Sequence, residues 1–198
     1  MRYAVQWLAQ AVGEPTASTD WHALVQSTAW ALIEQAASIR GTEDRSAEDT
    51  ERLLATTLVC AVIDHDNAGG GLVHIVGVGD SGAWILREGS FHRIEGGKTE
   101  GDGLSSSAVS GLPRVPTEVT ARSDRLLPGD VLLLGTDGFG DPLGVGDGEV
   151  GNLFRSVLSG RVPPLLEFGH ALDFSRETFD DDRTLVAVWP SFLTPADP

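Results

Sequence analysis

Apolar residues near the N-terminus recur three or four positions apart, which is the spacing of one face of an α-helix. This pattern predicts a helix over residues 2–12 and a second one over residues 21–36. The next residues, 41–49, are polar and predict a loop or the start of a short helix, followed by a short helical turn at 51–54. Three candidate N-caps precede the second helix: Ser18, Thr19 and Asp20.

From residue 55 the pattern changes to short β-rich runs separated by turn residues. Two hairpins are expected, the first from runs at 56–63 and 72–78 and the second from runs at 83–87 and 91–94. A Gly- and Ser-rich connection at 96–116 leads to two more strands, predicted at 118–124 and 131–136. Since the last run is almost entirely apolar, it should be a central strand covered on both faces.

The C-terminal third returns to helical spacing. Helices are predicted at 148–158 and 164–172, and a last strand at 184–189. The Gly-rich residues 140–151, with Asp141, Asp147 and Glu149, predict a solvated loop. Hairpins combined with separate helix pairs indicate an α+β domain over residues 1–190, with a tail at 191–198.

Composition narrows the functional classes. The 198 residues carry a formal net charge of -15, which disfavours binding to nucleic-acid phosphates. The sequence contains no apolar run near the roughly 20 residues that a membrane span needs, so a membrane partner is not expected. Cys60 is the single cysteine and lies in an apolar run, so a buried thiol and a reducing, cytoplasmic location are expected.

Three aspartates stand at the ends of predicted strands: Asp80, Asp137 and Asp181. Carboxylates gathered at one edge of a sheet repel each other unless a hard cation such as Mg²⁺ or Mn²⁺ relieves the repulsion. Each aspartate alone is equally typical of a turn cap. A cation-binding acidic module is therefore one open interpretation of this group.

Two other motifs have simpler explanations. Residues 77–82 match the Gly-x-Gly-x-x-Gly fingerprint of dinucleotide sites, but a strand is predicted where the fingerprint requires a helix. Asp64, His65 and Asp66 stand beside glycines and are typical of a solvated hairpin tip.

Four segments occur in the order seen in the PPM (protein phosphatase 2C type) family, and the chain resembles that family over nearly its whole length. Leu127-Pro128-Gly129-Asp130 leading into an apolar strand and Thr136-Asp137-Gly138 is the most specific of them. The others are Ala55-Thr56-Thr57-Leu58, Gly79-Asp80-Ser81-Gly82 and Asp181-Asp182-Arg183-Thr184.

The resemblance implies an antiparallel β-sandwich flanked by helix pairs, of a bacterial-like type, acting on phosphoprotein substrates. It implies metal-dependent hydrolysis of phosphoserine and phosphothreonine with Mn²⁺ or Mg²⁺. Asp137 and Asp181 would be ligands of one catalytic metal, Asp80 would serve an additional metal, and Gly138 and Asp182 would support them. A metal-activated water would attack phosphorus, so no catalytic side chain is needed as a nucleophile.

The sequence also departs from the family pattern. The first strands, with the Asp-Gly pair whose aspartate bridges the metals, have no counterpart, because the chain begins at a helix that would follow them. Gly82 stands where the family often has Arg, and Asp182 where it usually has Asn. Lacking these strands, the sheets are expected to expose their edges. Two hypotheses follow: a piece of a longer phosphatase, or an inactive pseudophosphatase that acts as a binding or regulatory module.

Overall fold

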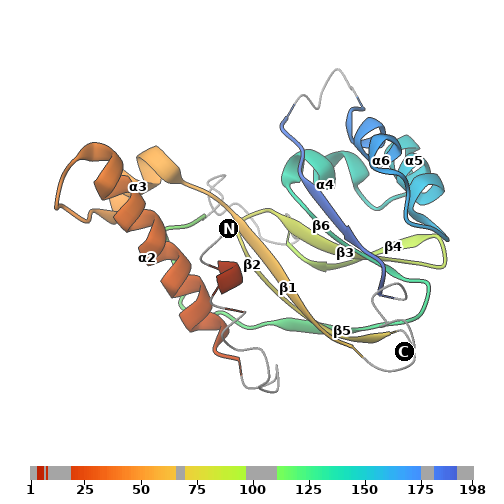
Figure 1. Cartoon of the computed structure of the whole chain (residues 1–198), viewed down its shortest axis with the longest axis horizontal. Coiled ribbons are helices and arrows are strands. Elements are labelled where there is room, and N and C mark those ends of the chain that lie inside the picture. The colour runs from red at the N-terminus through yellow and green to blue at the C-terminus, as the bar shows by residue number, and fades with distance from the viewer. Residues whose placement is uncertain are drawn as a thin grey trace, which may run out of the picture.

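The computed structural model describes residues 4–6, 8, 19–65, 70–96, 111–174 and 181–190, and contains two antiparallel sheets with helices outside them (Figure 1). Residues 4–6 and 8 are helical, and the rest of the helix expected at 2–12 lies outside the described residues. The helices are α2 (Trp21–Arg40), α3 (Ala47–Leu54), α4 (Asp137–Leu143), α5 (Glu149–Leu158) and α6 (Leu165–Leu172). The strands are β1 (Leu58–His65), β2 (Gly71–Val78), β3 (Gly82–Arg87), β4 (Ser90–Glu95), β5 (Arg122–Leu126), β6 (Val131–Gly135) and β7 (Leu185–Val188).

The first sheet has the order β1-β2-β5 and the second the order β4-β3-β6-β7, with every neighbouring pair antiparallel. Between the sheets, β1 contacts β6 and β5 contacts β4, so the outer strands β1 and β7 lie on the same side of the sandwich. The predicted α+β sandwich is confirmed. Apolar residues from both sheets form the layer between them: Val73, Ile75, Ala83, Ile85, Leu126 and Leu132.

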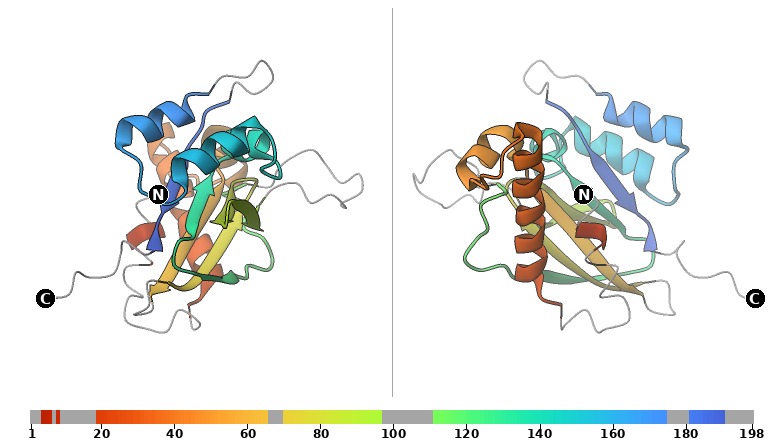
Figure 2. Two further views of the ribbon diagram at one scale, coloured as in Figure 1. Left: turned by 90° about the vertical axis from the view of Figure 1, so that its right-hand side faces the viewer. Right: turned by 60° about the vertical axis from the view of Figure 1, so that its left-hand side comes forward.

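Helix α2 covers the outer face of the first sheet (Figure 2). It starts where the Asp20 side chain accepts a hydrogen bond from the Ala23 N–H at 2.9 Å, and it ends at Gly41, whose φ of 63° is left-handed. Its buried face includes Leu24 and Val25, which lie in one cluster with Val76 of β2. No helix within the described ranges is long and apolar enough to cross a membrane.

Helices α4, α5 and α6 cover the outer face of the second sheet (Figures 1 and 2). The core of this layer is aromatic: Phe139 meets Trp84 and Phe154 edge to face, with ring centroids 5.5 Å and 5.0 Å apart. Both phenylalanines are fully buried. These contacts fix α4 on the end of the sheet that carries Asp137.

Two sequence predictions need correction. Helix α4 replaces the first part of the solvated loop expected at 140–151, because Phe139 and Leu143 bury its inner face against the sheet. The strand expected at 118–124 is observed at Arg122–Leu126, because its pairing with β2 starts at Arg122 and buries Leu126.

Candidate metal site

The register of the second sheet brings three segments that carry aspartates to one end of it. Gly82, the first residue of β3, pairs with Gly135 at the end of β6, and Gly135 pairs with Leu185 at the start of β7. Asp80 comes just before β3, Asp137 just after β6, and Asp181 shortly before β7. Because the pairs are antiparallel, all three segments leave the sheet at the same end.

Asp137 is the first residue of α4, with Thr136 as the N-cap. Its side chain is half-buried, and its Oδ1 accepts a hydrogen bond from the Gly138 N–H at 2.9 Å. This contact holds one carboxylate oxygen against the backbone.

The segment before β7 is bound directly to α4. Thr136 and Thr184 exchange two hydrogen bonds of 3.1 Å, from the Thr136 N–H to the Thr184 carbonyl and from the Thr184 N–H to the Thr136 hydroxyl. The Arg183 guanidinium donates to the Gly138 carbonyl at 3.2 Å. A Cβ at Gly138 would collide with the Asp182 carbonyl oxygen, so the close approach of the two segments requires glycine here.

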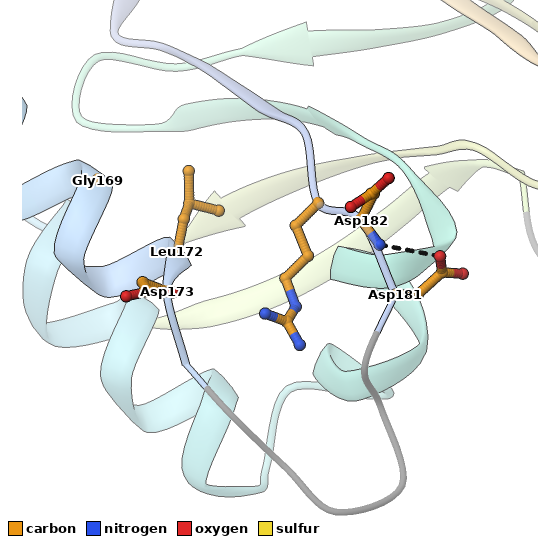
Figure 3. Close-up of a pocket in the computed structure, with 6 residues that line it drawn as sticks. Gly169, Leu172, Asp173, Asp181 and Asp182 are labelled. Atoms are coloured by element: carbon orange, nitrogen blue, oxygen red, sulfur yellow. Dashed lines mark hydrogen bonds between the residues drawn. The ribbon is translucent and has the colours of Figure 1, made fainter.

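Asp181 is exposed at the mouth of a shallow hollow between this segment and the end of α6 (Figure 3). Its Oδ1 accepts a hydrogen bond from the Asp182 N–H at 2.9 Å. The hollow has a volume of about 370 Å³ and is lined by Gly169, Leu172, Asp173, Asp181, Asp182 and Arg183. It is open and polar, and it gives solvent access to Asp181.

The half-buried Asp80 lies in a sharp bend between β2 and β3. Gly79 takes a φ of 94°, and a Cβ there would stand 2.5 Å from the Thr57 methyl group. The Thr57 and Ser81 hydroxyls are 2.7 Å apart and share a hydrogen bond, which ties the bend to the chain entering β1. The residues on either side of Asp80 are therefore both held against Thr57, Gly79 by close packing and Ser81 by a hydrogen bond.

The Trp84 ring packs against both the Asp80 and the Asp137 segments at this end of the sheet. A Cβ at Gly82 would stand 2.5 Å from its indole, and a Cβ at Gly140 would stand 2.8 Å from it. The indole therefore occupies the space that a side chain at residue 82 would need. This explains in physical terms why residue 82 carries no arginine.

The oxygen donors of Asp137, Asp181 and Asp80 suit Mn²⁺ or Mg²⁺ in kind. Too few of these donors lie together to bind an ion, however. Across the described ranges, no three or more His, Cys, Asp or Glu side chains are close enough to hold a metal ion. The donor chemistry therefore fits the ion, whereas the described side chains alone do not enclose one.

Sequence reasoning placed the aspartates at strand ends but missed the residues that connect their segments. These are Thr57, Ser81, Trp84, Thr136, Arg183 and Thr184. Thr136 and Thr184 each belong to a motif that carries an aspartate, and that membership was the available signal.

No protein-family model matches this sequence, and no curated protein does. Solved structures do match. The catalytic domain of the serine/threonine phosphatase PstP, in complex with two manganese ions, aligns with a TM-score of 0.56 and 20% identity over 86% of this chain and 70% of that one. A bacterial serine phosphatase variant aligns with a TM-score of 0.56 and 19% identity over 93% and 74%.

PppA of Pseudomonas aeruginosa, described as a regulatory component of a secretion system, aligns with a TM-score of 0.52 and 20% identity over 86% of this chain and 69% of that one. At sequence identities this low, the structural similarity establishes a shared fold but not a shared activity. Together with the two-sheet architecture, they show that the chain has the fold of the PPM-type serine/threonine phosphatases.

Proposed function

We propose that the chain is a metal-dependent phosphatase-type domain that hydrolyses phosphoserine and phosphothreonine in proteins of the cytoplasm. The observation that supports this most is the sheet register, which brings the segments of Asp80, Asp137 and Asp181 to one end of the sandwich. The same end carries a hollow open to solvent at Asp181. The manganese ions of the similar PstP structure support the choice of metal.

In this proposal Asp137 and Asp181 hold one Mn²⁺ or Mg²⁺ ion, and Asp80 serves an additional one. When bound, such ions activate a water and neutralise phosphoryl charge. The other residues of the chain contribute by holding the metal-binding aspartates in position. Thr136, Gly138 and Thr184 hold the Asp181 segment against α4, and each of the Asp137 and Asp181 carboxylates keeps one oxygen on a neighbouring N–H.

The test is Mn²⁺-dependent hydrolysis of p-nitrophenyl phosphate and of a phosphothreonine peptide. Asp137→Asn should abolish turnover and weaken Mn²⁺ binding at least tenfold, because a neutral amide is a far poorer ligand than a carboxylate. Asp147→Asn is the matched control, since Asp147 is exposed in the turn before α5, and it should change neither. Equal turnover in Asp137→Asn and the unmodified chain would refute the assignment.

A second candidate is a phosphatase-like module that binds a partner without hydrolysis. It is favoured by the lack of a three-donor group within the described ranges. Calorimetry separates the two: this candidate predicts weak or undetectable Mn²⁺ binding and no turnover at any Mn²⁺ concentration. Turnover that depends on Asp137 would exclude it.

A further inference from the structure

Arg93 of β4 is held in an unusual environment for a cation in this acidic chain. It is exposed, stands opposite Trp84 in the β3–β4 pair, and its guanidinium carbon lies 5.5 Å from the centroid of the Trp84 ring. Across the described residues it makes no ion pair. Two other arginines differ in this respect, because Arg87 is bonded to Asp130 and Arg122 to Glu95.

An arginine that pairs with no carboxylate among the described residues is notable in a chain of net charge -15. With 29 acidic residues against 14 basic ones, carboxylate partners are plentiful. Arg93 instead stacks on an aromatic face, an arrangement that restrains the guanidinium and leaves its N–H donors available for an anion.

The Trp84 ring links Arg93 to the candidate metal site. Beyond the contact with Arg93, the indole reaches Gly82 and Gly140, which follow Asp80 and Asp137 in their segments. Trp84 is only 2% exposed, so it is a rigid support and not a mobile surface residue. Through the Trp84 ring, Arg93 is therefore connected to the two segments that carry Asp80 and Asp137 to this end of the sheet.

We propose that Arg93 is a phosphate-binding residue of this site, which contacts the phosphoryl group of the bound substrate. This rests on the proposed function for its substrate class. A guanidinium offers paired N–H donors that match two phosphate oxygens, and its charge offsets the repulsion between a phosphate dianion and the nearby aspartates. The residue thus adds attraction for a phosphorylated substrate beside the three aspartates of the site.

Inorganic phosphate is a suitable probe because its binding needs no turnover. Its dissociation constant is measured by phosphorus NMR titration, with and without Mn²⁺, for the unmodified chain, Arg93→Ala and Arg93→Lys. Arg93→Ala should weaken phosphate binding about tenfold, as expected for loss of a charge-assisted hydrogen bond. Arg93→Lys should recover part of the affinity, since it keeps the charge but not the fork of donors.

Arg45→Ala is the matched control. Arg45 is an exposed arginine of the α2–α3 connection that is paired with Glu34, away from the second sheet, and its removal should leave phosphate binding unchanged. Equal phosphate affinity in the unmodified chain and Arg93→Ala, with folding confirmed by circular dichroism, would overturn the inference. So would a loss of the same size in Arg45→Ala.

Turnover separates this inference from the proposed function. If the chain hydrolyses a phosphopeptide, Arg93→Ala should raise KM about tenfold and leave kcat within about twofold, because the contact is made in the ground state as well. If it shows no hydrolysis, phosphate binding that depends on Arg93 still stands and the proposed hydrolysis fails. Hydrolysis with phosphate binding unaffected by Arg93→Ala would instead overturn the role of Arg93 and leave the proposed hydrolysis standing.

Discussion

Gly138 is the residue at which the α4 backbone and the Asp181–Thr184 segment come closest. Gly138→Ala should lower the free energy of unfolding by about 1–3 kcal/mol, because the new Cβ meets the Asp182 carbonyl and not a flexible side chain. Urea unfolding measures this. Gly169→Ala, in α6 with nothing within 4 Å of its Cβ, should be neutral or slightly stabilising. Equal effects of the two substitutions would contradict the close approach.

Cys60 should make the folding stability of the molecule depend on pH above neutrality. Burial raises the pKa of this thiol to about 12, whereas in an unfolded chain it is about 8.5. Above pH ~8.5 the unfolded chain loses this proton and the folded chain keeps it, so the stability is complete below that pH and declines up to about pH 12.

Between pH 8 and 10, Cys60 should therefore account for about 1–2 kcal/mol of lost stability. Urea unfolding of the unmodified chain and of Cys60→Val at several pH values measures this contribution. The valine variant should lack it. Parallel pH profiles for the two proteins would show that the thiol is accessible to water in the folded state.

Among the elements, the turn between β5 and β6 is fixed by a buried ion pair. Asp130 is 3% exposed, and its Oδ2 accepts from the Leu127 N–H and from an Arg87 Nη2 donor, both at 2.8 Å. Asp130→Ala should cost about 3 kcal/mol in urea unfolding, since it leaves a guanidinium and a turn N–H without their acceptor.

Asp124→Ala is the matched control for Asp130→Ala. Asp124 stands 3.9 Å from the same Arg87 but is more exposed, so its loss should cost less than about 1 kcal/mol. Costs of equal size would mean that the turn does not depend on the Asp130 contacts.

Element prediction from sequence succeeded where turn chemistry and periodicity agreed, and failed where packing decided. The β3–β4 hairpin follows from Glu88, Gly89 and Ser90, and α5 follows from its apolar face. Helix α4 has glycines at 138 and 140 and Pro142 within seven residues, a composition that opposes a helix. Burial of Phe139 against Trp84 stabilises it nevertheless, and that contact spans segments far apart in the chain.

The candidate site likewise combines features that the local sequence predicts with features that depend on tertiary packing. Positions of Asp80, Asp137 and Asp181 at strand ends were readable from the apolar runs before or after them. Their arrival at one end of one sheet depends on the pairing of β3, β6 and β7, which local patterns do not encode. Arg93 was not singled out, because its significance comes from a cross-strand neighbour.

Over the whole molecule, β1 and β7 are the outer strands on one side of the sandwich, and each pairs with one neighbour in the described sheets. Val186 of β7 is 47% exposed, and the apolar residues of β1 from Leu58 to Ile63 are half-buried. The central strands β3 and β6 are paired on both sides. Protection of the backbone should therefore differ between the two sets of strands.

Amide hydrogen exchange followed by NMR measures this difference. In β3 and β6 nearly every N–H is committed to a neighbouring strand and should exchange slowly, near the limit set by global unfolding. In β1 and β7 alternate N–H groups point away from the paired neighbour, so fast and slow amides should alternate along each strand. Uniformly slow exchange along β1 would show that another segment or a partner covers this edge, and a rise in protection with protein concentration would identify that partner as a second copy of the chain.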